Sequence, residues 1–304
     1  MSEDSSGIFN NEFKYMVSGD SISKGVIYDE TKNKYVVLED NYVSLLQKKL
    51  RGAIHNTARF GNTLVKGLTN LKKDVLKDRP NFVLIEYGGN DCDFNWNEIA
   101  EQPDAEHSPK TDFSMFEKML TEAIQFVRSQ QITPILMSLP PLNADKYFKW
   151  VSRNDPEAEQ NIMKWLGSVT KIYWWQERYN STILKVSELT KTKYIDVRGA
   201  FLEHPDFTKF LCSDGIHPNQ DGHRIIFDKV LEFMRTNYRF CFGRAATWRW
   251  IEPDGADGGA RCRNLKMAQI EFAHAELRGP NGKASSIEIR GNFCPYFESS
   301  PLLY

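Results

Sequence analysis

The chain has 304 residues, of which 41% are hydrophobic and 26% are charged, a composition typical of a globular protein with one large core. Its 39 basic and 40 acidic side chains give a formal net charge of -1, so no overall field attracts nucleic acid or an anionic membrane. We therefore expect no nucleic acid among its partners.

The beginning of the chain is polar and acidic, and no apolar segment of a secretory signal follows it. No stretch of the sequence approaches the roughly 18 apolar residues of a membrane span. The five cysteines are odd in number and lack the paired spacing of zinc ligands, which disfavours a disulfide framework and a structural zinc site. These features predict a soluble protein of the cytoplasm.

Short apolar segments alternate with longer segments of helical period along most of the chain. This alternation is typical of βαβ units, and it predicts an α/β fold in which helices cover both faces of a parallel sheet. We expect five parallel strands, each ending near small, polar or proline residues. They are expected at residues 14–17, 53–56, 82–87, 135–138 and 194–197.

A small hairpin is expected directly after the first strand, because apolar residues 26–28 and 35–37 flank a polar stretch. A helix is predicted over 43–50. Two longer helices are indicated by apolar residues at helical spacing, the first of them after the cap candidates Thr111 and Asp112. The two apolar stripes are Phe113, Phe116, Leu120, Ala123, Ile124 and Val127, and Ile225, Ile226, Val230, Phe233 and Met234.

The segment 147–179 is rich in aromatic residues and longer than a minimal connection between two strands. One interpretation is a cap over the substrate pocket, with Trp150, Trp174 and Trp175 as candidate pocket residues. The other is a helix whose apolar face is simply buried, which we favour for five further positions. These positions are Ile162, Trp165, Leu166, Val169 and Ile172.

The composition changes from Phe240 onward. Residues 1–240 hold 21 Lys and 10 Arg, whereas residues 241–304 hold 2 Lys, 6 Arg and seven Gly. No segment after the glycine-rich stretch shows a helical or strand period, so we expect a weakly ordered extension and not a second domain. The predicted division is an N-terminal extension over 1–12, one main domain over 13–239 and an atypical C-terminal extension over 240–304.

The first predicted strand leads into Gly19-Asp20-Ser21, which places Ser21 at the carboxyl end of a strand, where open α/β sheets bind ligands. A serine hydroxyl needs a base within hydrogen-bond reach and a third group that fixes the tautomer of that base. Of the six histidines, only His217 lies in a segment dense in loop-forming and titratable residues, three positions after Asp214. We therefore predict a nucleophile at Ser21, a base at His217 and an orienting acid at Asp214.

Two glycine-marked turns offer donors for a developing oxyanion, each worth roughly 2.7 to 4 kcal/mol in the transition state. Gly61 follows the second predicted strand and presents its backbone amide without a side chain. Asn90 follows the third predicted strand, in the turn 86–91. Because parallel strands end at the same edge of a sheet, both groups are expected beside Ser21.

Taken together, these residues resemble the four diagnostic blocks of the SGNH, or GDSL-like, serine hydrolases. The blocks are Gly19-Asp20-Ser21, Gly61, Gly88-x-Asn90-Asp91 and Asp214-x-x-His217, in this order. The resemblance runs from about Phe13 to Asn237, with Ile22 where many members have leucine. It implies a flavodoxin-like three-layer α/β/α sandwich with strand order 2-1-3-4-5. It also implies hydrolysis of carboxylic esters without a metal or cofactor, with an oxyanion hole made of the Ser21 amide, the Gly61 amide and the Asn90 side chain.

Each block alone is more often a turn or a helix cap than a catalytic group, but their joint occurrence favours an enzyme. Two alternatives stay open: an acyltransferase with an acceptor other than water, and an inactive module that binds a carbohydrate or a lipid. The expected substrate is a small molecule with a short acyl ester, such as an acetylated sugar. Acyl length, leaving group and oligomeric state are not predicted.

The other titratable groups near these blocks are given structural roles. Asp221 and His223 do not complete a metal site with the catalytic pair, because Pro218 interrupts the segment and no second cluster supplies ligands. His223 is expected to help position the His217 loop. Asp20 is assigned to loop organisation, Asp91 and Asp93 to turns, and Cys92 and Cys212 to packing.

Overall fold

Five parallel strands form the central sheet of the computed structural model, which describes residues 13–242. The strand order is β4-β1-β5-β6-β7, and without the two hairpin strands this is the order 2-1-3-4-5. The predicted α/β class, the number of strands and their order are therefore confirmed. The strands are β1 (Phe13–Gly19), β4 (Gly52–Asn56), β5 (Phe82–Glu86), β6 (Thr133–Met137) and β7 (Lys193–Ile195).

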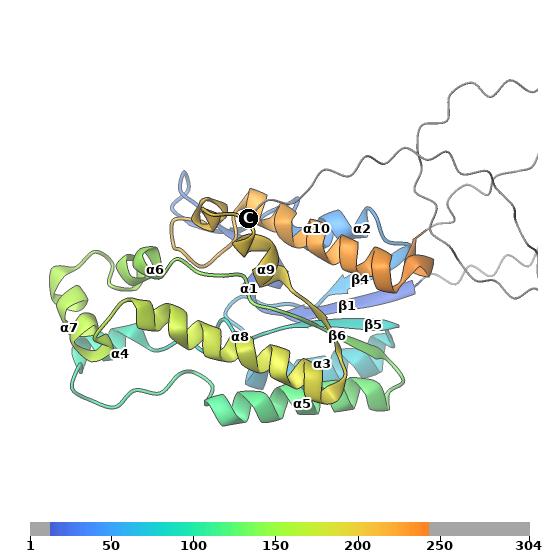
Figure 1. Ribbon diagram of the computed structural model, residues 1–304, viewed down its shortest axis with the longest axis horizontal. Coiled ribbons are helices and arrows are strands. Elements are labelled where there is room, and N and C mark those ends of the chain that lie inside the picture. The colour runs from blue at the N-terminus through green and yellow to red at the C-terminus, as the bar shows by residue number, and fades with distance from the viewer. Residues whose placement is uncertain (1–12, 243–304) are drawn as a thin grey trace, which may run out of the picture. The chain divides into compact units, whose positions relative to one another are not determined.

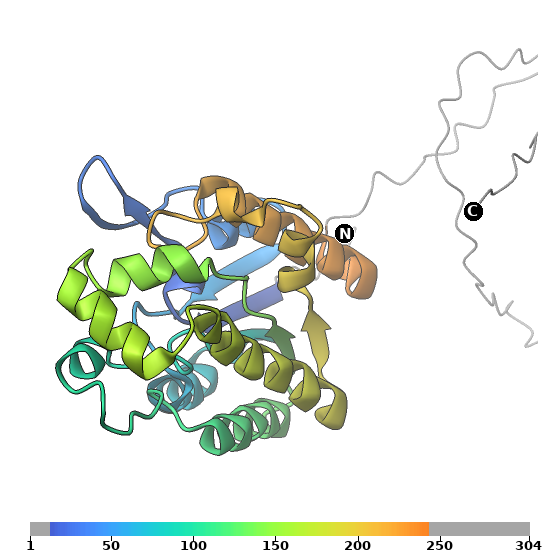
Figure 2. The ribbon, with the colours of Figure 1, turned by 60° about the vertical axis from the view of Figure 1, so that its left-hand side comes forward.

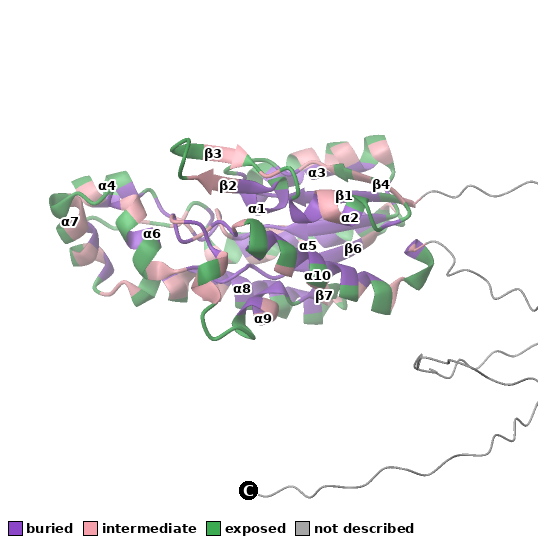
Figure 3. Ribbon diagram, turned by 90° about the horizontal axis from the view of Figure 1, so that it is seen from above, coloured by how far each residue is buried: buried purple, intermediate pink, exposed green. Residues whose placement is uncertain are grey.

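Helices cover both faces of this sheet, and the strands between them are largely buried (Figures 1 and 3). In β1, Tyr15 and Val17 pack into the apolar cluster on one face, whereas Met16 packs into the cluster on the other, as the two-residue period of a strand requires. The first face carries α2 (Tyr42–Gln47), α9 (Val197–Leu202) and α10 (Gln220–Asn237). The second carries α3 (Leu64–Asp78), α5 (Phe113–Ser129) and α8 (Thr170–Thr190).

A third group of helices has an apolar cluster of its own, which includes Phe94, Tyr147 and Ile162. It consists of α4 (Trp96–Glu101), α6 (Ala144–Val151), α7 (Pro156–Leu166) and the beginning of α8, and we call it the cap. The cap lies at the end of the sheet where β1 leads into α1 (Ser21–Lys24) (Figures 1 and 2).

The hairpin predicted after the first strand is present as β2 (Val26–Asp29) and β3 (Lys34–Val37), an antiparallel pair in which Val26 lies opposite Val37. The helix predicted after the cap candidates is also present as α5, and its N-terminus is capped by Asp112, whose carboxylate accepts from the amides of Ser114 and Met115. The remaining elements within residues 13–242 are two short 3-10 helices, at Phe207–Phe210 and Arg239–Cys241.

Several predicted boundaries differ from the structure by one to three residues, and two of the differences have a clear physical cause. The last strand ends at Ile195 and does not reach residue 197, because the Asp196 side chain accepts a hydrogen bond from the Gly199 amide and begins α9. The helix predicted over 43–50 ends at Gln47, whose exposed side chain bonds to the backbone of Gly52 and Ile54 in β4.

The single helix expected around residues 162–172 is wrong, because two helices meet there. Gly167 has a φ of 73°, a left-handed conformation that favours glycine, and it ends α7 before α8 begins at Thr170. Leu166 and Ile172 therefore belong to different helices, although both are buried in the cap.

The two predicted terminal extensions lie almost wholly outside the described part of the chain, which includes only residues 240–242 of the second and none of the first. Across residues 13–242, every helix is too short or too polar to cross a membrane.

Candidate active site

Ser21 is the first residue of α1 and lies immediately beyond the end of β1. The Asp20 carboxylate accepts a hydrogen bond from the Ile22 amide at 2.9 Å, which fixes the sharp change from strand to helix. This turn places the Ser21 side chain at the carboxyl edge of the sheet, as predicted, and confirms Asp20 as an organiser of the loop.

The structure brings Ser21, His217 and Asp214 together in one hydrogen-bonded chain. The His217 Nε2 atom lies 2.9 Å from Ser21 Oγ, and Nδ1 lies 2.5 Å from Asp214 Oδ2. All three residues are buried. Burial disfavours the charged form of Asp214, but the hydrogen bonds and the charge of His217 outweigh it and lower the pKa of this carboxyl. The acid is therefore ionised and oriented towards the imidazole.

The loop that carries this pair is tied to its surroundings by backbone contacts. The Cys212 amide donates to the His217 carbonyl at 2.8 Å, and Asn219 caps the N-terminus of α10 through the Gly222 amide. The side chain of His223 does not position this loop as expected: its buried ring packs parallel to that of Tyr42 and, within residues 13–242, makes no hydrogen bond to the loop. Burial lowers the pKa of His223 to about 4.

Gly61 and Asn90 border the same cleft as Ser21 and His217. The Asn90 Nδ2 atom donates to Asp20 Oδ2 at 3.1 Å, so the carboxamide is held by the residue that also caps α1. Gly61 has a φ of 68°, a conformation that disfavours any residue with a Cβ. The predicted oxyanion donors thus lie at the same sheet edge as the nucleophile.

A buried carboxyl that the sequence reasoning missed lies beneath this turn. Glu86, at the end of β5, is fully buried, and its Oε2 atom accepts from Ser23 Oγ at 2.8 Å, while Ser23 also bonds to Tyr42. Burial, and next the charge of the adjacent Asp20, raise the pKa of Glu86 well above its usual range. Glu86 is therefore neutral in the folded protein. In the sequence, the position of this acidic residue within the apolar segment 82–87 could have indicated a buried carboxyl.

We expect Glu86→Gln to change how stability depends on pH. The raised pKa means that Glu86 stays protonated in the folded state while it ionises in the unfolded chain above about pH 4.5, so the wild type loses stability as pH rises. Glutamine does not ionise, so the variant does not lose this stability as the pH rises. The free energy of unfolding is measured in urea between pH 5 and 9. Relative to the wild type, it should increase with pH for Glu86→Gln and stay constant for the exposed control Glu188→Gln. Parallel curves for Glu86→Gln and the wild type would contradict the assignment.

The cleft in front of Ser21 has a volume of about 700 Å³. Trp150 and Trp175 line it, as predicted, but Trp174 does not: it is 52% exposed and packs against Arg178. On α8 the cleft is lined by Ile172, Trp175 and Gln176, which lie at i, i+3 and i+4 on one face of the helix, and Trp174 lies outside this face. Further lining residues are Tyr35, Phe60, Lys66, Asn95, Trp96, Asn97, Lys110, Tyr147 and Arg153.

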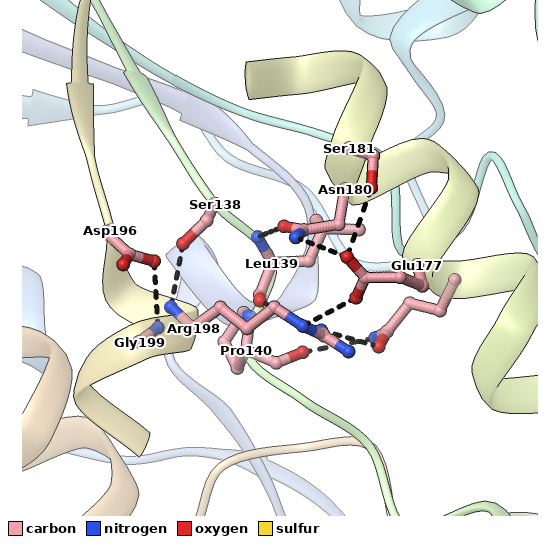
Figure 4. A network of polar contacts seen from close by, with 10 residues as sticks. Ser138, Leu139, Pro140, Glu177, Asn180, Ser181, Asp196, Arg198 and Gly199 are labelled. Carbon is pink, nitrogen blue, oxygen red and sulfur yellow. Dashed lines mark hydrogen bonds and ion pairs between the residues drawn. The ribbon is translucent and has the colours of Figure 1, made fainter. Parts of the chain in front are cut away.

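A network of polar contacts surrounds the buried Arg198 (Figure 4) and includes Gln176, which lines the cleft. Arg198 on α9 is only 5% exposed; it pairs with Glu177 on α8 at 2.8 Å and donates to the Gln176 side chain at 3.1 Å. Gln176 in turn donates to the Pro140 carbonyl after β6 at 3.2 Å. Since both ends of the Gln176 amide are engaged, this lining residue has a fixed orientation.

Asp91 and Asp93 connect separate segments and are not simple turn formers. Asp91 is fully buried and accepts from the Leu64 amide, at the start of α3, and from Thr111. Asp93 accepts from Trp96 and Tyr147 in the cap.

Cys92 and Cys212 are buried, as expected of packing residues, and burial raises the pKa of both thiols, that of Cys212 to about 11. Nowhere in residues 13–242 do three His, Cys, Asp or Glu side chains gather as metal ligands would. The expectation that no metal takes part stays a prediction.

The sequence and the fold of this chain are similar to those of known proteins. The model of the GDSL-like lipase/acylhydrolase family matches residues 17–225, well over half of the chain. A lipase/acylhydrolase from Enterococcus faecalis has a similar structure, with 21% identity, a TM-score of 0.53, and coverage of 74% of this chain and 96% of that one. A catalytic mutant of an acetylxylan esterase from Geobacillus stearothermophilus gives 19% identity and a TM-score of 0.51, with coverage of 73% and 93%.

An alpha/beta hydrolase enzyme from the metagenome of Lake Arreo gives 22% identity and a TM-score of 0.51, with coverage of 72% and 94%. The search of curated protein sequences returned no match. At these identities the solved structures establish the fold, whereas the family model covers every block that surrounds the cleft. The chain therefore belongs to the GDSL-like lipase/acylhydrolase family and is a carboxylic ester hydrolase.

Proposed function

We propose that this protein hydrolyses short acyl esters through an acyl-enzyme on Ser21. The observation that supports this proposal most directly is the continuous hydrogen-bonded chain from Ser21 Oγ through the His217 ring to Asp214, buried at the edge of an accessible cleft. This is the arrangement that activates a hydroxyl for attack on a carbonyl carbon.

In the first half of the reaction, Ser21 Oγ attacks the ester carbonyl while His217 Nε2 takes the hydroxyl proton. Asp214 stabilises the imidazolium that forms, because its ionised carboxylate accepts from Nδ1. Collapse of the tetrahedral intermediate breaks the ester C–O bond, and His217 gives its proton to the departing alcohol. Water then attacks the acyl-serine by the same route and releases the acid and free Ser21.

The negative charge on the carbonyl oxygen would be stabilised by the Ser21 amide, the Gly61 amide and the Asn90 side chain. Asp20 supports this role by holding the Asn90 carboxamide through one of its N–H groups, which leaves the other N–H for the oxyanion. Each half-reaction uses only protein groups and water.

The lining of the cleft favours an acetylated sugar as the substrate. Aromatic rings of Phe60, Trp150 and Trp175 offer flat apolar faces, while Asn97 and the fixed amide of Gln176 offer donors and acceptors for hydroxyl groups. A structure of similar fold is that of an acetylxylan esterase, which is consistent with this choice.

Hydrolysis of a p-nitrophenyl ester series, from acetate to long acyl chains, tests the proposal. We expect the highest kcat/KM for acetate and a steep decline with chain length. Acetylated oligosaccharides should release acetate, and product analysis with an added alcohol should show acid and not a new ester. Activity on no ester, or acyl transfer as the main outcome, would overturn the proposed function in favour of a binding module or a transferase.

A further inference from the structure

The hairpin β2–β3 brings a tyrosine into contact with the buried acid of the triad. Tyr35 Oη donates a hydrogen bond to Asp214 Oδ2 at 3.2 Å, and the Tyr35 ring lies 5.1 Å from the His217 ring. We propose that Tyr35 is a positioning residue for the triad, which sets the basicity of His217 through Asp214. This inference rests on the proposed function, because it assigns a role within the same reaction.

The hydrogen bonds of Asp214 show why a donor from another element matters. Oδ1 accepts from the backbone amides of Ile216 and His217, each at 3.1 Å, and Oδ2 accepts from His217 Nδ1 at 2.5 Å. These three donors all belong to the acid's own loop. A carboxylate has about four acceptor positions, and Tyr35 fills the fourth from the hairpin, 179 residues away in sequence.

Aromatic packing holds the hydroxyl of Tyr35 in place. Its ring contacts those of Phe60 at 5.3 Å and Trp150 at 6.2 Å, and Phe60 also stacks on His217, so the rings of Tyr35, Phe60 and His217 contact one another. Burial, and then the charge of Asp214, raise the pKa of Tyr35. The phenol therefore stays protonated and remains a donor over the working range of a serine hydrolase.

The expected direction follows from competition for one oxygen atom. Tyr35 and His217 both donate to Oδ2, so the phenol weakens Oδ2 as an acceptor for the imidazolium. Removal of the phenol hydroxyl should therefore stabilise the imidazolium and move the titration of His217 to higher pH. The other groups that act on this ring are Asp20, Ser21 and His223, and a change at Tyr35 leaves all three in place.

The test compares Tyr35→Phe with Tyr28→Phe. Tyr28 lies opposite Tyr35 in the hairpin and bonds to Asn33, and it does not line the cleft. The His217 ring is titrated by NMR with labelled histidine, and its signal is identified by its loss in His217→Gln. We expect a rise of about 0.5 to 1 pH unit in the midpoint for Tyr35→Phe alone.

The acidic limb of kcat/KM should shift by the same amount. The plateau should fall roughly threefold to tenfold, because Asp214 loses the donor that holds it from the hairpin and the triad is less well oriented. An unchanged His217 titration in folded Tyr35→Phe would overturn the inference, as would an equal shift in Tyr28→Phe. A plateau loss without any shift would also overturn it, because that result assigns Tyr35 to substrate contact alone. The NMR titration needs no substrate, so it decides the role of Tyr35 even if no ester is hydrolysed and the proposed function fails.

Discussion

Replacement of Ser21 with alanine is expected to reduce ester hydrolysis roughly 10⁴- to 10⁶-fold, which is the range found when a serine nucleophile is removed from a comparable triad. The variant keeps the cleft and the His217–Asp214 pair, but it has no oxygen atom that can form the acyl-enzyme. Only one hydroxyl is lost, so the fold should be retained. The measurement is kcat/KM for p-nitrophenyl acetate at equal concentrations of folded protein.

The exposed Ser129, on α5, supplies a matched control, and Ser129→Ala should hydrolyse the ester at the wild-type rate. Incubation with a p-nitrophenyl phosphonate should add one phosphonyl group to the peptide that contains Ser21, as detected by mass spectrometry. Activity of Ser21→Ala within tenfold of the wild type, or a label on another residue, would exclude Ser21 as the nucleophile.

Replacement of Asp214 with asparagine should lower kcat about 10⁴-fold, the effect known for the equivalent change in a serine protease. Asparagine keeps the size of the side chain, but its amide group donates where the carboxylate accepts. The wrong tautomer of His217 is then favoured, and the imidazolium loses its buried counter-charge. Steady-state kinetics at several pH values would measure the loss.

Asp206→Asn is the control for this change, since Asp206 is exposed and, within residues 13–242, its side chain bonds only to that of Thr208. It should leave kcat unaltered. Because Asp214 also organises its own loop through two backbone amides, near-ultraviolet circular dichroism should be compared for both variants. A loss of less than about tenfold in Asp214→Asn would show that this acid does not orient the base.

The local sequence predicted those parts of the site that depend on strand ends. Ser21, Gly61 and Asn90 each follow a strand, and parallel strands of one sheet deliver their carboxyl ends to one edge. The loop with Asp214 and His217 was recognised because both partners lie within four residues. In these cases the covalent spacing already determines most of the geometry.

Contacts between distant elements were not predictable in the same way. The apolar residues that flank a polar stretch predicted β3, but nothing in residues 34–37 indicates that Tyr35 meets Asp214, because that contact depends on how the hairpin packs against the loop of Asp214. Trp174 and Trp175 were indistinguishable until the rotation of α8 was known. The break at Gly167 was missed because an apolar period continued across it.

The separate apolar cluster of the cap has a consequence for how such an enzyme diversifies. Substitutions at Trp96 or Ile172 alter the cleft while they disturb mainly the packing among α4, α6, α7 and the start of α8. The helices and strands that hold Ser21 in place are packed around two other apolar clusters, one on each face of the sheet. Selection for new substrates can therefore change the cap while the groups that carry out the chemical step stay the same. Libraries of variants with substitutions confined to the cap should retain a higher fraction of active members than libraries with substitutions spread over the sheet.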